Sequence, residues 1–174
     1  MPRTMHRDDH PIYSKPGHLI RRLQQIAVAI FMAETERFNV TPVQYSALLT
    51  VELHPGIDQT TLVNIIAFDR STIGNVVGRL ESKKLIKRAA GARDRRTKRL
   101  TITPQGRRLL REIRDSVESA QKLILAPLRP AERSAFMTLL KRLVQINNAL
   151  SRVPLRTAHE SRRRKKARDP AHDS

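Results

Sequence analysis

A short, densely cationic segment limits the folds open to this chain more than any other feature of its sequence. Five Lys or Arg residues fall within residues 93–99, where Asp94 is the one acid. Residues 85–88 and 98–102, on its two sides, have the composition of β-strands, and a glycine lies in the loop between them. The pair Thr-Pro at 103–104 follows at once as a helix start. The sequence therefore predicts a cationic β-hairpin joined directly to a helix.

Helical spacing of apolar residues accounts for most of the remaining chain. Prolines and polar capping residues mark the expected helix starts, and prolines mark several of the ends. The expected helices run from 17 to 38, from 42 to about 53, over a short stretch after the cap Asp58, from 70 to about 83, from 104 to Pro127 and from 130 to Pro154. One hairpin among six helices makes the fold class mainly α (α+β), in one main domain.

The fourth expected helix has two faces of different chemistry. Its apolar residues are Ile73, Val76, Val77 and Leu80, which fall on one side at about 100° per residue and must face the core. The other side carries small and polar groups and no acid: Ser71, Gly74, Asn75, Gly78, Arg79 and Ser82. The two glycines cost about 1 kcal/mol each relative to alanine. Either tight packing against the third helix or close approach to a DNA backbone offsets this cost.

Two short helices joined by a tight turn, the second with a polar face, are typical of a helix-turn-helix. With the cationic hairpin they predict a winged helix, whose second helix enters the major groove while the hairpin reaches a neighbouring backbone or minor groove. The candidate DNA-contacting residues are Arg70, Ser71, Thr72, Asn75 and Arg79 on the helix and Lys87, Arg88, Arg93, Asp94, Arg95, Arg96 and Lys98 in the wing. Asp94 is expected to pair with Arg96 and fix the loop, and Lys87 and Arg88 are expected to face phosphates.

The charge balance agrees with a polyanionic partner. A net charge of +18 and a pI near 11.5 indicate either nucleic acid or an anionic membrane. A nonspecific architectural DNA- or RNA-binding protein is the alternative, because charge alone does not separate it from a specific DNA-binding protein. Four Phe and two Tyr residues are too few for base-stacking platforms, which argues against this alternative.

Other function classes find no support in the sequence. The chain has no cysteine, and its six histidines show no ligand spacing, so we expect no metal and no cofactor. Phosphate-binding, dinucleotide-binding and zinc-protease motifs are absent, which argues against an enzyme. No segment has the composition of a signal peptide or a membrane span, so a cytoplasmic protein is expected. Residues 1–15 are expected to be flexible, and residues 154–174 to form a disordered basic tail.

The run FDRSTIGNVVGRLESKKLIKR, followed by RDRRTKRLTITPQGRRLL, resembles the MarR family of bacterial transcription regulators. The motifs that carry the resemblance are Asp69-Arg70-Ser71-Thr72, Arg79-Leu80-Glu81, Asp94-Arg95-Arg96, and Leu100-Thr101-Ile102-Thr103 with Gly106. The resemblance covers about residues 16–152 and implies a domain over 16–153. Within it, dimerisation helices would occupy about 16–38 and 103–152, and the winged helix about 41–102. It also implies a homodimeric repressor that binds an inverted-repeat operator, associated with the nucleoid through DNA.

Two further observations bear on this resemblance. The last expected helix carries an apolar stripe near seven-residue spacing, which one small domain cannot cover and which therefore favours a dimer: Phe136, Leu140, Leu143 and Leu150. Members of the family commonly have glycine before the first wing strand, where this chain has Lys84. Because glycine suits a left-handed helix cap, Lys84 predicts a different helix ending and a different angle between helix and wing.

Cationic and polar residues near the start of the first helix are candidates for effector binding. His18, Arg21, Arg22 and Gln25 share one face close to a helix N-terminus, which attracts anions, and Tyr45 is expected nearby. The segment KPGHLIRRLQQIA looks like a branch of the family that controls aromatic-acid degradation. That resemblance implies an anionic aromatic effector, and a coenzyme A thioester is preferred because its phosphates match the cations. The alternative is that these residues form solvated surface or intersubunit bridges.

Overall fold

The structure of the chain, a computed structural model, describes residues 10–90 and 98–156. Its α-helices are α1 (Pro16–Glu34), α2 (Pro42–Leu53), α3 (Gln59–Ile66), α4 (Arg70–Ser82), α5 (Pro104–Leu125) and α6 (Pro130–Ile146). Its strands are β1 (Ile57–Asp58), β2 (Ile86–Ala90) and β3 (Lys98–Ile102), and its 3-10 helices are η2 (Pro11–Ser14), η3 (Glu36–Phe38) and η4 (Asn148–Leu150). No helix within the described ranges is both long and apolar enough to cross a membrane.

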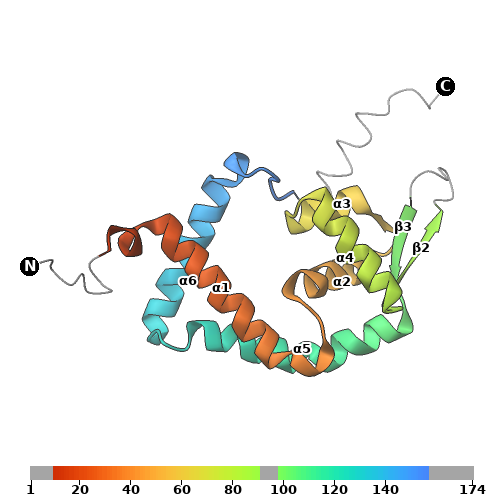
Figure 1. The fold of residues 1–174 in the computed structure, drawn as a ribbon, viewed down its shortest axis with the longest axis horizontal. Helices are drawn as coiled ribbons and strands as arrows, with labels where there is room; N and C mark the ends of the chain where they lie inside the picture. Colours follow the sequence, from red (N-terminus) through yellow and green to blue (C-terminus); the bar gives the residue numbers. More distant parts are fainter. Residues whose placement is uncertain (1–9, 91–97, 157–174) are drawn as a thin grey trace, which may run out of the picture.

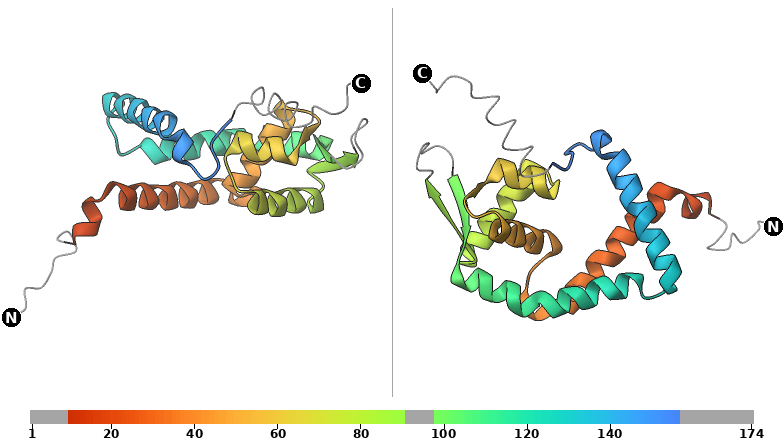
Figure 2. Two further views of the ribbon diagram at one scale, coloured as in Figure 1. Left: turned by 90° about the horizontal axis from the view of Figure 1, so that it is seen from above. Right: turned by 180° about the vertical axis from the view of Figure 1, so that it is seen from behind.

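The helices form an open, U-shaped molecule (Figure 1). The long helix α5 makes the base, and α1 packs along it. At one end α2, α3, α4 and the small sheet gather into a compact unit, which we call the winged-helix lobe (residues 42–102). At the other end α6 crosses α1 in this view, and the view from behind shows the same separation of this end from the lobe (Figure 2). We call α1, α5 and α6 the helical arm.

The main hydrophobic core lies inside the winged-helix lobe. It forms where α2, α3 and α4 meet the inner face of the sheet. Its fully buried large side chains are Leu48, Leu62, Ile73, Leu80, Ile86 and Leu100. A smaller cluster of Phe31, Val40, Ile113 and Val117 joins the end of α1 to α5. The lobe therefore holds the larger core, to which Leu110 of α5 also contributes, whereas among the described residues the arm has this smaller cluster.

Polar caps explain why several of these helices begin where they do. Thr41 and Gln44 form a reciprocal capping box at the start of α2. Asp58 accepts a hydrogen bond from the Thr61 amide at 2.9 Å and begins α3, as the sequence predicts. Thr103 accepts a hydrogen bond from the Gly106 amide at 3.0 Å and begins α5.

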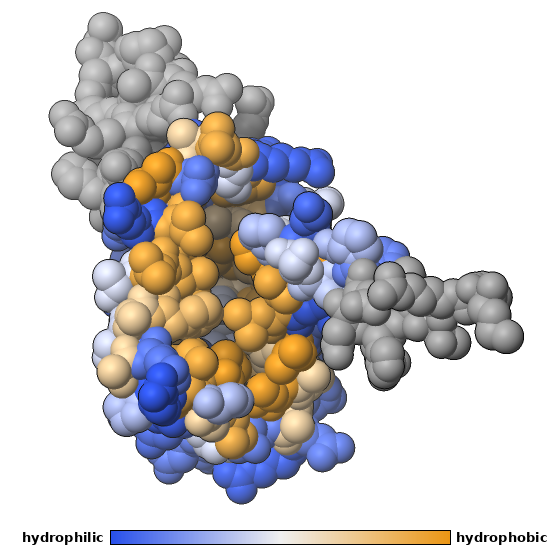
Figure 3. All heavy atoms as spheres, turned by 90° about the vertical axis from the view of Figure 1, so that its left-hand side faces the viewer, coloured by the Kyte–Doolittle hydropathy of each residue, from blue (hydrophilic) through white to orange (hydrophobic). Residues whose placement is uncertain are grey.

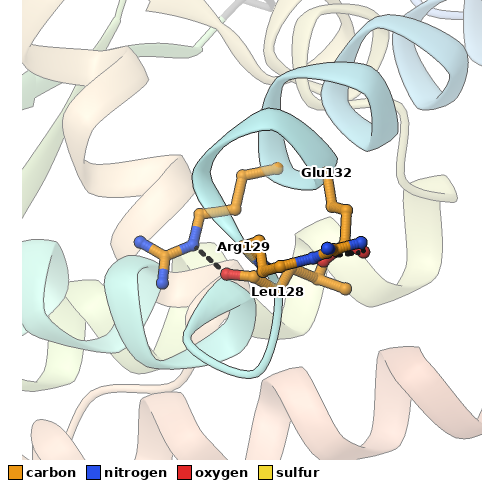
Figure 4. A network of polar contacts seen from close by, with 4 residues as sticks. Leu128, Arg129 and Glu132 are labelled. Atoms are coloured by element: carbon orange, nitrogen blue, oxygen red, sulfur yellow. Dashed lines mark hydrogen bonds and ion pairs between the residues drawn. The ribbon is translucent and has the colours of Figure 1, made fainter.

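The turn between α5 and α6 is held by its own arginines (Figure 4). The amide of Arg129 donates to Glu132 Oε2 at 2.8 Å, which caps the start of α6. The side chain of Arg133 donates from Nε to the Leu128 carbonyl at 2.7 Å and from Nη2 to the Ala126 carbonyl at 3.1 Å. These bonds satisfy the carbonyl of the α5 cap, Ala126, and that of Leu128 in the turn, and they hold the start of α6 against the turn.

The predicted hairpin is part of a larger sheet. β2 and β3 pair antiparallel, with Ile86 opposite Ile102 and Ala90 opposite Lys98. The unpredicted strand β1 pairs with the other edge of β3, so the order is β1-β3-β2. β2 also continues two residues beyond the expected end at residue 88. Two residues are too short a strand for periodicity to reveal, because only the partner strand identifies them.

Several predicted boundaries differ from the structure. The expected first helix ends as α1 at Glu34 and continues as the 3-10 turn η3, and α6 ends at Ile146 rather than at Pro154. The expected flexible start reaches too far, because η2 begins at Pro11 with a cap from His10. The expected tail begins too early, because Leu155 and Arg156 form hydrogen bonds with the folded chain.

Candidate nucleic-acid interface

The start of α4 is fixed by the carboxylate of Asp69. The Ser71 hydroxyl and the Thr72 amide donate to its Oδ1 at 2.6 and 2.8 Å, and the Thr72 hydroxyl donates to its Oδ2 at 2.6 Å. The hydrogen bond from Ser71, followed by those from Thr72, holds the pKa of Asp69 far below its ordinary value. The hydroxyl protons of Ser71 and Thr72 are therefore used in the cap, and Thr72 is half-buried. Both residues can offer DNA only their remaining lone pairs.

The outer face of α4 has the composition of a nucleic-acid surface. Arg70, Asn75 and Arg79 are exposed, and among the described residues their side chains have no hydrogen-bond or ion-pair partner. The opposite side of the helix is buried in the lobe, as the sequence predicts. An arginine and an asparagine present the donors and acceptors that base edges in the major groove recognise.

The two glycines of α4 are not required by packing inside the chain. A Cβ atom at Gly74 would lie 3.5 Å from Gln59 Nε2, and one at Gly78 would lie 3.9 Å from Arg88 Nη2, both ordinary contacts. Gly106 is different, because a Cβ there would lie 2.3 Å from the Leu85 carbonyl oxygen. Tight packing against α3 therefore does not explain Gly74 and Gly78.

Lys84, which follows α4, has a left-handed backbone with φ +57°, the conformation of a glycine cap. The Leu85 amide bonds to the Leu80 carbonyl at 2.9 Å and the Lys84 amide to the Glu81 carbonyl at 2.8 Å. This is the Schellman pattern that glycine usually forms. The prediction of a different helix ending is wrong, because the buried contact of Leu80 with Leu85 and the packing of the wing stabilise a backbone that lysine alone disfavours.

The two cations predicted to face phosphates from strand β2 have different environments. Lys87 is exposed, whereas Arg88 points back to α4 and pairs from Nε with Glu81 Oε2 at 2.9 Å. Adjacent residues in a strand face opposite sides, so both could not face phosphates as predicted. For Arg88 the prediction is corrected: its guanidinium links the wing to the recognition helix. Lys98 is exposed on β3.

The tip of the wing lies outside the described residues. Arg93, Asp94, Arg95, Arg96 and the expected pair between Asp94 and Arg96 all fall there. Two contacts that the sequence did not indicate support the region around it. Lys83 donates from Nζ to the Asn39 carbonyl, and Arg99 donates from Nη1 to the Gly56 carbonyl at 3.1 Å. Both partners are backbone carbonyls in turns distant in sequence, so no residue pattern could have identified them.

The predicted effector residues do not form one site in the described chain. Arg22 donates to Gln25 at 3.0 Å, Arg21 is exposed, and the His18 ring meets Tyr13 edge to face at 5.5 Å. The expectation that Tyr45 lies nearby is wrong, because its ring packs 6.0 Å from that of Phe31. Phe31 is ten residues beyond Arg21 on α1, about 15 Å along a helix.

Tyr45 of α2 is half-buried where α2 meets α1 and α5. Burial raises the pKa of its hydroxyl, an effect that Arg114 opposes and Glu118 reinforces.

An apolar groove of about 970 Å³ opens on the helical arm between α1, α5 and α6. Figure 3 shows the hollow and the apolar side chains around it. Of the predicted effector residues only Arg22 lines it, beside Leu23, Phe136 and Leu140. All of the α6 side chains are at least partly exposed in the single chain, including Leu139, Leu143 and Ile146.

The comparisons with known proteins agree with this arrangement. A family model described as MarR family matches residues 38–97. A protein of Thauera aromatica named as a putative transcriptional regulatory protein for the hcr operon is 38% identical over 128 residues, covering 73% of this chain and 77% of that protein. The chain belongs to the MarR family. It is therefore a transcription regulator of the MarR type and not an enzyme.

Solved structures of MarR-type regulators share the fold. Bordetella bronchiseptica BpsR, whose structure concerns the regulation of its DNA binding by 6-hydroxynicotinic acid, is 30% identical with a TM-score of 0.72, over 77% of this chain and 96% of that chain. The Streptomyces coelicolor regulator PcaV in complex with its natural ligand is 31% identical with a TM-score of 0.69, over 78% and 96%. The match extends over both the winged-helix lobe and much of the helical arm.

Proposed function

We propose that this MarR-type regulator is a repressor that binds an inverted-repeat operator as a homodimer and is released by an anionic aromatic compound. The observation that carries the DNA-binding part is the outer face of α4. It presents Arg70, Asn75 and Arg79 with no partner among the described residues, and two glycines that intrachain packing does not need. A groove of DNA supplies both the polar partners and the close approach.

The homodimer is supported by the helical arm. α6 and the facing side of α1 expose apolar side chains around one groove, and a contiguous apolar surface of this kind marks an interaction site. A second copy of the chain is the fitting partner, because the arm lacks the core that would stabilise it alone. A dimer also brings two α4 helices to one side, as an inverted repeat requires.

The effector proposal rests on the relatives and on the chemistry of the arm. BpsR responds to 6-hydroxynicotinic acid and PcaV is solved with its natural ligand. The second copy would cover most of the groove, and its border, where Arg22 stands beside apolar side chains, suits an aromatic ring with one anionic group. A free aromatic acid therefore ranks before its coenzyme A thioester, because several phosphates would need more cations than the groove lining provides.

The decisive experiment measures discrimination rather than affinity alone. Fluorescence anisotropy would compare an inverted-repeat operator from the neighbouring promoter with a scrambled duplex of equal length. Asn75→Ala and Arg79→Ala should each lower the ratio of the two affinities, at a cost of about 1–3 kcal/mol on the operator. Thr138→Ala, on the exposed side of α6, is the matched control and should change neither affinity. Equal losses on both duplexes would contradict the groove assignment and favour the nonspecific alternative.

The effector is tested by titrating operator-bound protein with a panel of aromatic acids and their thioesters. Release by at least one free acid is expected, and Arg22→Ala should need more ligand for release while it retains DNA affinity. Release by thioesters alone would contradict the ranking of a free aromatic acid before its coenzyme A thioester. If no compound released the protein, the effector part of the proposal would be wrong, with the DNA-binding part unaffected.

A further inference from the structure

The last described residues return from the helical arm to the winged-helix lobe. Residues 151–156, which we call the strap, leave η4 and reach α3, so that they close the open side of the U (Figure 1). They lie beyond the last α-helix, where the sequence predicts the end of that helix as far as Pro154 and then a tail. Its last two residues, Leu155 and Arg156, form hydrogen bonds with Asn148 after α6 and with Asn64 of α3.

Asn148 anchors the strap on the arm. The Leu155 amide donates to Asn148 Oδ1 at 2.8 Å, and Asn148 Nδ2 donates to the Leu155 carbonyl at 3.0 Å. One side-chain amide thus satisfies both backbone groups of one strap residue, which fixes its position and its direction. The Ser151 hydroxyl donates to the Val153 carbonyl at 3.1 Å and closes the turn before it.

The lobe anchors the strap through the end of α3. The Arg156 amide donates to the Asn64 carbonyl at 2.9 Å. Asn64 lies within the last four residues of α3, whose carbonyls have no partner inside the helix, so the strap completes this helix end. Val153, half-buried, packs against the core cluster of the lobe.

We propose that the strap is a conformational restraint, which holds the winged-helix lobe at the orientation to the helical arm that DNA binding needs. Among the described residues, the other main contacts between lobe and arm lie on the base of the U, where α2 meets α1 and α5 and where β3 leads into α5. Rotation about that base would break the bond between Arg156 and Asn64 and expose Val153. The inference rests on the proposed dimer, in which lobe orientation sets the distance between the two α4 helices.

The strap then acts by raising the fraction of molecules whose lobe has the orientation that fits the operator. A lobe free to rotate spends part of its time in orientations that do not fit the operator, and the apparent dissociation constant rises in proportion.

The test uses two matched pairs of variants in the full-length chain. Asn148→Leu removes the anchor on the arm, and Asn147→Leu is its control, because the Asn147 amide donates only to the Leu143 carbonyl within its own helix end. Arg156→Pro removes the N–H that meets α3, and Arg156→Ala is its control, since it loses the same charge but retains the N–H.

Two readouts separate the inference from the proposed function. The chain has no cysteine, so Thr60→Cys on α3 and Lys141→Cys on α6 take spin labels at two defined sites. In labelled protein diluted with unlabelled protein, Asn148→Leu and Arg156→Pro should broaden the distance distribution between the labels, whereas both controls should leave it unchanged. The two anchor variants should also weaken operator binding about three- to tenfold relative to their controls.

The outcomes are distinct. A distance distribution identical to that of the controls would overturn the inference, whatever the DNA affinity. A broadened distribution with operator affinity equal to the controls would overturn the claim that the restraint serves DNA binding. Failure of the unsubstituted protein to recognise any operator would reject the proposed function, and the distance measurement would still decide whether the strap restrains the lobe.

Discussion

Lys84 has a left-handed backbone at the junction between α4 and the wing, where glycine is the favoured residue. A residue with a Cβ atom is strained at this φ, and glycine is not. We therefore expect Lys84→Gly to raise the free energy of unfolding by about 1 kcal/mol, as measured by urea denaturation. Lys84→Ala retains the Cβ atom and should leave stability close to that of the unsubstituted chain. Equal stabilisation by both substitutions would mean that the charge of Lys84, not its φ, is unfavourable.

The helix cap that Asp69 forms at the start of α4 should make the stability of the fold depend on pH. Hydrogen bonds from Ser71 and Thr72 lower the folded-state pKa of Asp69 below the ordinary carboxyl value, so its ionised form stabilises the fold. That contribution is present above the ordinary pKa near 3.8 and is lost as the pH falls through the lower folded-state value. Asp69→Ser retains a cap that does not titrate. The melting temperature of the unsubstituted chain should therefore exceed that of Asp69→Ser near pH 7, and the difference should shrink below about pH 4. A constant difference would show that ionisation of Asp69 does not stabilise the helix.

At the scale of elements, the wing and the recognition helix form one unit through Arg88 and Glu81. Lys87 on the same strand is free to reach a phosphate. Lys87→Met should weaken operator and random DNA alike and reduce the salt slope of binding by about one. Arg88→Met should change the salt slope less and instead lower stability by about 0.5 kcal/mol, since the pair is partly exposed. Anisotropy at several salt concentrations and urea denaturation measure the two effects. The reverse pattern, with the larger salt effect at Arg88, would show that Arg88 leaves Glu81 for the DNA.

At the scale of the whole molecule, the proposed homodimer is tested on the helical arm. Leu143 is 55% exposed in the single chain and lies on the apolar side of α6. Leu143→Asp should give a monomer in sedimentation velocity and bind the full operator far more weakly, because a buried charge would oppose the interface and one lobe meets only one half-site. Thr138→Asp introduces the same charge on the polar side of α6 and should remain dimeric. A dimer in both variants would place the interface elsewhere and leave the apolar groove to another ligand.

Local interactions account for what could be predicted from the sequence. Asp58, Asp69 and Thr103 begin their helices through bonds to residues three positions on, so a short window of sequence contains both partners. The polar outer face of α4 follows from helical periodicity alone. Family membership and the type of fold were evident for the same reason, because the motifs that carry them lie within one continuous stretch from α4 through the wing.

Contacts between distant segments decided the rest. β1 exists only because β3 pairs with it, and Lys84 adopts its left-handed backbone only because Leu80 and Leu85 pack together. Arg88 pairs with Glu81 because the register of β2 directs its side chain toward α4. The Tyr45 ring packs on Phe31, far from the start of α1 where the sequence predicts it. The sequence predicts a tail from residue 154 because the partner of Arg156 on α3 is a backbone carbonyl, and every residue has one. The sequence thus determined the helices, their caps and the chemistry of the recognition face, whereas the tertiary structure alone determined which side chains remain free to bind, because only packing shows which of them already have partners.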